Sequence, residues 1–448
     1  SVAAADSTAA AAGAADGGST DDADSVAVFF RPEGVDGHDG PAGLSAVLEP
    51  VARAVRSVDV AVYGLTDDTV RNALMAAHQR GVRVRVIVDK EQAEEPGADA
   101  KWLAEQGVQV VEAPGSEDGR LFHHKVIVAD GAVMATGSLN LTKHASHANW
   151  ENMVVTAEPA AVAAFQAEFD RLWALCGPDA AAADASASLL ADAPSAHGPL
   201  VQASSATGAA AGGGAFAAGR TESIFFPCGE EGLKRLCKYM STAKTSLSVA
   251  ALALTSDRVR EAVKACHVAG VQVRVLADRS KSTEPGSDLA WLSKKSVPVR
   301  CARPTGDESS LFHHKVSRWA IVHRGATTRV SIAEPHGQAC YHSYRAVHAR
   351  TLSRLRVLRV GRKLQVPLHP SLPMAPLFTF AVAWLLLRVR CAPQFFVVDD
   401  HTVVTGSFNL TASAAERNFE SVVVMASKGA AARYTAEFDT LWDAAVQL

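Results

Sequence analysis

The sequence predicts an α/β protein built from two tandem domains, each a mixed β-sheet flanked by helices. Two observations predict this class. Short Val-rich or alternating segments, which are typical of strands, take turns with stretches of helical periodicity, and the whole series occurs twice in 448 residues. The chain is 48% hydrophobic and 20% charged. This composition supplies enough apolar residues for a packed core and excludes a wholly disordered chain.

The duplication is visible as segments that match at two successive offsets. Leu121-Phe-His-His-Lys125 recurs at 311–315, an offset of 190 residues. Gly137-Ser-Leu-Asn-Leu-Thr142 recurs as Gly406-Ser-Phe-Asn-Leu-Thr411, where the offset has become 269. The two copies therefore match as far as Lys315, shift by 79 residues and then match again.

The elements of the first copy follow from its local patterns. The second helix is expected to begin after a cap at Thr66 or Asp67 and to end at Gly81. Strands are predicted at 25–30, 58–65, 82–89, 108–113, 121–130, 132–137 and 150–156, and helices at 43–57, 68–80, 98–106 and 159–174. The resulting organisation is an acidic Ala-rich tail over 1–24, a first domain over 25–176, an Ala/Gly/Ser linker over 177–220 and a second domain over 221–448.

Residues 316–394, here called the insert, interrupt the second copy and differ from the rest in composition. The insert holds 12 of the 44 Lys and Arg residues but one of the 47 acidic residues, Glu334. The remaining chain therefore has 32 basic and 46 acidic residues, a formal charge of −14. Val316-Ser317 can be encoded by GTGAGT and Pro393-Gln394 by CCGCAG, which are the usual ends of a eukaryotic intron. We interpret the insert as a retained intron; the alternative is a basic arm that binds lipid or nucleic acid. Phe395–Val398 is expected to resume the interrupted strand.

Both copies carry the same polar residues at the same spacing. The first set is His123, Lys125, Asp130, Ser138, Asn140 and Glu151, and the second, read across the insert, is His313, Lys315, Asp399, Ser407, Asn409 and Glu420. Without the 79 insert residues, 28 positions separate the first histidine from the glutamate in each copy. If the insert is kept, Ala320 stands where the second aspartate is expected.

These residue types suit the chemistry of a phosphate group. Strand alternation places His123 and Lys125 on one face, and Ser138 and Asn140 likewise. An ammonium and an amide bind the non-bridging oxygens of a phosphate, while an imidazole attacks or protonates. Two copies related by a pseudo-twofold axis bring two histidines to opposite sides of one phosphorus, as in-line displacement requires. His124, one position away, faces the other side and is expected to be structural.

The duplicated set resembles the phospholipase D superfamily, which is defined by HxKxxxxD with GSxN, twice. The Phe29-Phe30 start and the Gly-Val-x-Val-Arg-Val strand are most similar to the mitochondrial cardiolipin hydrolase and small endonuclease branch, whose members carry one motif per chain and dimerise. The resemblance implies two phospholipase D-like α/β/α domains that pack with pseudo-twofold symmetry inside one chain.

The resemblance also implies the roles of the site residues. It implies a phosphohistidine intermediate formed without a metal, with His123 as nucleophile and His313 as general acid. The lysines and aspartates complete the catalytic sets, the serines and asparagines bind phosphate, and Glu151 and Glu420 orient the imidazoles. No cofactor is expected, and seven cysteines without a CxxC pair indicate neither a zinc site nor a disulfide scaffold.

The substrate is less well defined by the sequence than the chemistry. The −14 charge outside the insert favours a cardiolipin-like phospholipid over nucleic acid, which is bound by Lys and Arg. The alternatives are a metal-independent endonuclease acting on single strands and a homologue made inactive by its split second motif. Expected partners are the phosphodiester substrate and a membrane surface, and the pseudo-dimer makes a monomer plausible. An intracellular location, cytoplasmic or mitochondrial, is expected because 1–24 lacks a signal sequence and no apolar run reaches ~18 residues.

Overall fold

A computed structural model of the chain describes residues 25–31, 40–113, 120–177, 221–302 and 393–448, with the backbone of five strands between 319 and 367. The predicted 1–24 tail and nearly all of the linker lie outside these residues, as do His313 and Lys315. The chain divides into two compact units, one of Ser1–Arg303 with Arg390–Leu448 and one of Pro304–Val389. No helix among the described residues is long and apolar enough to cross a membrane.

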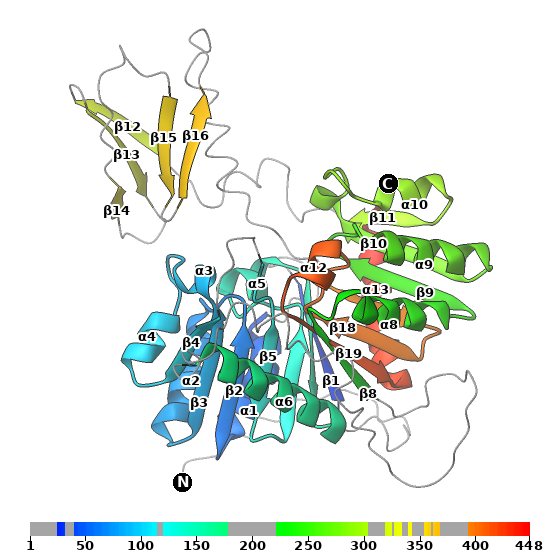
Figure 1. Cartoon of the computed structure of the whole chain (residues 1–448), viewed down its shortest axis with the longest axis horizontal. Coiled ribbons are helices and arrows are strands. Elements are labelled where there is room, and N and C mark those ends of the chain that lie inside the picture. Colours follow the sequence, from blue (N-terminus) through cyan, green and yellow to red (C-terminus); the bar gives the residue numbers. More distant parts are fainter. Residues whose placement is uncertain are drawn as a thin grey trace, which may run out of the picture. The chain divides into compact units, whose positions relative to one another are not determined.

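The first copy forms a seven-stranded mixed sheet in the order β1-β7-β6-β5-β2-β3-β4, drawn in blue to cyan in Figure 1. Its strands are β1 (Ser25–Phe30), β2 (Ser57–Val62), β3 (Arg83–Asp89), β4 (Gln109–Ala113), β5 (Lys125–Ala129), β6 (Val133–Gly137) and β7 (Glu151–Thr156). Its helices are α1 (Gly40–Arg53), α2 (Asp68–Gln79), α3 (Lys90–Ala93), α4 (Ala100–Glu105), α5 (Lys143–Ala148) and α6 (Pro159–Cys176). The strands β2, β3 and β4 run parallel, and the remaining pairs are antiparallel.

Side-chain caps explain where several helices begin. The Asp67 carboxylate accepts from the Thr69 N–H at 2.9 Å and starts α2, and Gly81 ends the turn after it with a φ of 83°, which favours glycine. Two short helices were not predicted. Asp89 caps α3 and Thr142 caps α5, and both helices are shorter than the window in which helical periodicity becomes visible.

The second copy repeats this sheet with one extra edge strand. The order is β8-β19-β18-β17-β9-β10-β11-β20, so green β9 and orange β18 and β19 share one sheet in Figure 1. Its strands are β8 (Thr221–Phe226), β9 (Ser246–Ala251), β10 (Gln272–Asp278), β11 (Val299–Ala302), β17 (Phe395–Val398), β18 (Thr402–Gly406), β19 (Glu420–Ala426) and β20 (Val446–Gln447). Its helices are α8 (Gly229–Ser241), α9 (Asp257–Val268), α10 (Leu289–Lys294), α12 (Ala412–Glu416) and α13 (Lys428–Ala444), with a 3-10 turn, η3, at Arg279–Lys281. The predicted pair of tandem α/β domains is confirmed.

Strand β17 takes the place in the second sheet that β5 takes in the first. Phe395 pairs with Ala250 on β9 and with Thr405 on β18. Val126 on β5 has the corresponding partners, Ala61 and Thr136. The chain therefore resumes the sheet in the repeat's own register directly after the insert, as the sequence predicted.

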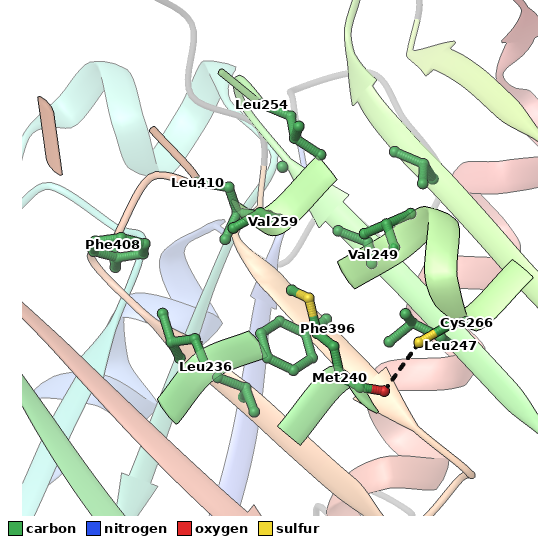
Figure 2. Packing of buried hydrophobic residues seen from close by; sticks show 14 of the residues in the cluster. Leu236, Met240, Leu247, Val249, Leu254, Val259, Cys266, Phe396, Phe408 and Leu410 are labelled. Atoms are coloured by element: carbon green, nitrogen blue, oxygen red, sulfur yellow. Dashed lines mark hydrogen bonds between the residues drawn. The ribbon is translucent and has the colours of Figure 1, made fainter. Parts of the chain in front are cut away.

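Burial explains why this short strand keeps its place. All four residues of β17 are buried. Phe396 packs among the side chains of α8, including Leu236 and Met240, as Figure 2 shows. Phe395 faces the opposite side and joins the core shared by the two copies. An empty slot at this position would expose both cores to water.

The described part of the insert is made of short antiparallel strands. Strands β12 (Trp319–Arg324), β13 (Thr327–Ala333) and β14 (Ala339–His342) form one sheet, and β15 (Arg354–Arg359) and β16 (Arg362–Pro367) form a hairpin. The unbalanced basic composition did not predict these strands. The apolar stretch 377–387 lies outside the described residues.

The two copies share a hydrophobic core built from α6, α13 and the facing sides of both sheets. Ring contacts cross between them: Phe165 of α6 meets Phe225 of β8, and Phe29 of β1 meets Tyr434 of α13, each at 5.0 Å between ring centres. The Tyr434 hydroxyl also lies 3.1 Å from the Asn152 Oδ1 in β7. The copies thus pack face to face, and each completes the other's core.

Candidate active site

The loop before β5 carries His123 to the boundary between the two copies. Phe122 forms a parallel bridge with Phe419, and the His123 N–H donates to the Phe419 carbonyl at 2.9 Å. Asp89 holds the same loop from the other side by accepting from the Phe122 N–H at 2.9 Å. Burial raises the pKa of the Asp89 carboxyl, against the backbone N–H groups that lower it. His123 itself is only 6% exposed.

Glu420 of the second copy holds the imidazole of the first. The His123 Nδ1 lies 2.8 Å from the Glu420 Oε2 and 3.2 Å from the Ser407 carbonyl oxygen. Glu420 is completely buried and also accepts from the Ser407 hydroxyl at 2.7 Å and the Asn418 amide at 3.1 Å. Because both neighbours of Nδ1 are acceptors, Nδ1 carries a proton, which in a neutral imidazole leaves the lone pair on Nε2. A residue of one copy therefore sets the tautomer of the other copy's histidine.

Lys125 and Tyr63 complete the surroundings of His123. Lys125, the first residue of β5, is buried and donates from Nζ to the His123 carbonyl at 2.9 Å. The Tyr63 ring meets the imidazole edge-on at 5.1 Å and lies 5.7 Å from the Lys125 Nζ. The corresponding residue of the second copy is Leu252, so the two half-sites are not equivalent.

Glu151 occupies the position in the first copy that Glu420 occupies in the second. It is 1% exposed and accepts from the Ser138 hydroxyl at 2.5 Å and the Asn149 amide at 2.9 Å. These bonds match those that Ser407 and Asn418 make to Glu420. The other predicted catalytic histidine, His313, lies outside the described residues.

The Gly-Ser-x-Asn segments follow the ends of β6 and β18 and do not lie on the strands as the alternation predicted. A Cβ on Gly137 would come within 2.1 Å of the Asn152 carbonyl oxygen, so the close approach of β7 requires glycine here. Ser138 is fully buried, and Asn140 is half-buried with an Oδ1 that finds no hydrogen-bond partner among the described residues. The predicted β5 is also too long: the strand begins at Lys125, which leaves His123 in the preceding loop.

Asp130 and Asp399 do not join the site. Asp130 follows β5 at the end opposite Lys125, about 16 Å away at the rise of a strand. Its carboxylate accepts from the N–H groups of Val55, Arg56 and Ser57 at 2.7–3.0 Å. Burial alone would raise the pKa of Asp130, but these three donors lower it overall.

Asp399 repeats the arrangement in the second copy. It accepts from the N–H groups of Lys244, Thr245 and Ser246, which likewise lower its pKa against the effect of burial. Both aspartates have a positive φ, 56° at Asp130 and 51° at Asp399. They fasten the loop before β2 or β9 to the sheet, so we infer a structural role and not a catalytic one.

His124 lies on the other side of the chain from His123, as its sequence position indicated. It is completely buried, its ring packs against Phe122 at 5.1 Å, and within the described part of the chain neither ring nitrogen has a hydrogen-bond partner. Burial lowers the pKa of His124 to about 3. It therefore stays neutral at physiological pH.

Sequence reasoning missed two kinds of site residue. Asn149 and Asn418 stand two residues before the glutamates at the repeat offset of 269, so the duplication itself carried that signal. Tyr63 has no tyrosine counterpart, and comparison of the copies could not find it. Among the described residues no group of His, Cys, Asp or Glu is arranged to hold a metal.

Comparison with known proteins adds to this geometry. A family model described as the phospholipase D-like domain of cardiolipin synthase matches residues 47–173 and 384–442. Mitochondrial cardiolipin hydrolase of Chlamydomonas reinhardtii is 35% identical over 30% of this chain and 58% of its own, and that of Xenopus laevis is 38% identical over 29% and 60%. The chain spans less than two thirds of the length of these relatives. The solved structure of NucT from Helicobacter pylori, 19% identical, has a TM-score of 0.31 over 34% of this chain and 98% of its own. With its duplicated set of site residues, the chain is similar to the phospholipase D-like domain of cardiolipin synthase and to the mitochondrial cardiolipin hydrolases.

Proposed function

We propose that the protein is a phosphodiesterase of the phospholipase D type that hydrolyses a cardiolipin-like phospholipid through a phosphohistidine. The observation that carries the proposal is the 2.8 Å hydrogen bond from His123 to Glu420, which joins the two copies at one buried site. An imidazole held through Nδ1 by a carboxylate presents Nε2 as a nucleophile. This bond supports a single reaction centre built from both halves.

In the first step the His123 Nε2 attacks phosphorus and forms a P–N bond. The bond from phosphorus to the leaving oxygen breaks, and that oxygen takes a proton from the protonated His313 imidazole. Lys125 and Asn140 stabilise the charge that builds on the non-bridging oxygens. Glu420 stabilises the positive charge that His123 acquires when its lone pair is used.

In the second step a water oxygen attacks phosphorus on the side that the leaving group vacated. His313, now neutral, accepts a proton from the water, and the P–N bond breaks to return the electron pair to His123. The products are a phosphomonoester and an alcohol. Both steps balance with water as the only co-substrate.

The names of the relatives support a phospholipid substrate, and the −14 charge outside the insert agrees with it. The test uses cardiolipin vesicles and single-stranded DNA, each in excess EDTA, with the full chain and with a chain that lacks 316–394. We expect phosphatidic acid from the shortened chain, and none after His123→Ala. DNA cleavage without lipid hydrolysis would support the endonuclease alternative, and no turnover of either substrate would overturn the proposal.

A further inference from the structure

Gln394 stands where the second copy should present its lysine. It directly precedes Phe395, which has the register of Val126, and Val126 directly follows Lys125. Gln394 is therefore the counterpart of Lys125 in the sheet. In the sequence the lysine of the second motif, Lys315, lies 79 residues earlier.

The Gln394 side chain contacts Ser407–Asn409, the segment of the second copy that is predicted to bind phosphate. It is 5% exposed, and its amide nitrogen donates to the Asn409 Oδ1 at 2.8 Å. With the amide turned over, the nitrogen donates to the Ser407 and Phe408 carbonyl oxygens at 3.1 and 3.0 Å. In either orientation a neutral amide, and not an ammonium, contacts this segment.

We propose that Gln394, at the strand position that Lys125 takes in the first copy, limits the second half-site, so that the chain with the insert binds a phosphodiester but turns it over slowly. A chain without 316–394 joins Lys315 to Phe395 and places an ammonium at the same strand position. The inference rests on the proposed function and concerns how that function is regulated. The presence or absence of the insert decides whether a glutamine or a lysine stands directly before Phe395.

The size of the effect follows from charge. A phosphodiester is an anion, and negative charge on its non-bridging oxygens is held more strongly by an ammonium than by an amide. Loss of one such preorganised donor in other enzymes costs about 10²–10³-fold in rate. We expect the exchange of glutamine for lysine at position 394 to change turnover by that order.

The test adds the charge without removing the insert. Full-length protein, Gln394→Lys and the matched control Gln394→Glu are compared with bis(p-nitrophenyl) phosphate, whose leaving group needs no general acid. Binding of inorganic tungstate is measured by calorimetry. Gln394→Lys should release p-nitrophenolate about 10²-fold faster and bind tungstate more tightly, and Gln394→Glu should do neither.

A reciprocal variant covers the case in which Gln394→Lys fails to fold, which its melting temperature reveals. Lys315→Gln in the chain without 316–394 restores a glutamine to the same strand position and should lower turnover toward that of the full chain. If the shortened chain is active and Lys315→Gln leaves its rate unchanged, the inference is wrong and the proposed function stands. If the shortened chain hydrolyses no phosphodiester, the proposed function fails, and tungstate binding by Gln394→Lys still decides whether the position is an anion site.

Discussion

Replacing Glu420 by glutamine should remove most of the proposed phosphodiesterase activity while preserving the shape of the site. The Asn418 amide donates to the Glu420 Oε1, so the carbonyl oxygen of a glutamine stays there and its NH2 group faces His123. That NH2 group is a donor, and it favours the imidazole tautomer with the proton on Nε2, which removes the attacking lone pair. The comparable exchange in a serine protease triad lowers turnover by about 10⁴. We expect a loss of about 10³-fold in kcat/KM here, or roughly 4 kcal/mol in transition-state stabilisation.

The assay measures kcat/KM for a p-nitrophenyl phosphodiester against pH in the chain without 316–394. Glu437→Gln is the matched control, because Glu437 is also buried and also pairs across the copies, with Arg31 at 2.5 Å, but has no hydrogen bond to any catalytic side chain that the structure describes. The control should lower the melting temperature without removing activity. A Glu420→Gln variant within tenfold of the parent protein, or an equal loss in Glu437→Gln, would refute the assignment of Glu420 as the positioning residue of His123.

Three further predictions separate structural from catalytic roles. Asp130→Asn should lower the free energy of unfolding by about 1 kcal/mol and leave kcat within a few-fold. Because the pKa of Asp130 is depressed in the folded chain, its contribution to stability is present above the unfolded pKa of 3.8 and is lost as the pH falls through the folded pKa. A 10²-fold loss of kcat would return Asp130 to the catalytic set. His124 has a pKa lowered from 6.5 to about 3, so below pH 6.5 the unfolded chain binds a proton that the folded chain does not. His124→Phe should therefore remove about 2 kcal/mol of destabilisation that builds up between pH 7 and 5. An unchanged pH dependence of the melting temperature would contradict this. An activated p-nitrophenyl ester should partly rescue His313→Ala and not His123→Ala in steady-state assays, and the reverse pattern would exchange the two roles.

The duplication is the reason that so much of the fold could be predicted. Because the same series of segments occurs twice, each copy supports the order of strands and helices predicted for the other, and the 79-residue change in offset located the insert. The apolar run Phe395–Val398 marked where the sheet resumes, because four consecutive buried residues suit a central strand.

The details of the site depend on contacts between the copies, which no local pattern contains. The motif predicted that the glutamates orient the histidines. The hydrogen bond that crosses from Glu420 to His123, however, depends on how the two sheets pack. The motif suggested catalysis for Asp130, whereas its three backbone donors come from a loop more than 70 residues away in sequence. Tyr63 is found only from its ring contact, since its position carries leucine in the other copy.

In the proposed reaction His123, held by the opposite copy, forms the covalent intermediate. Rapid acid-free quenching of the chain without 316–394 during turnover of a ³²P-labelled phosphodiester, followed by peptide mapping, tests it most directly. We expect label on the peptide that contains His123, and none after His123→Ala. Full turnover without any labelled histidine, or label confined to His313, would contradict the account.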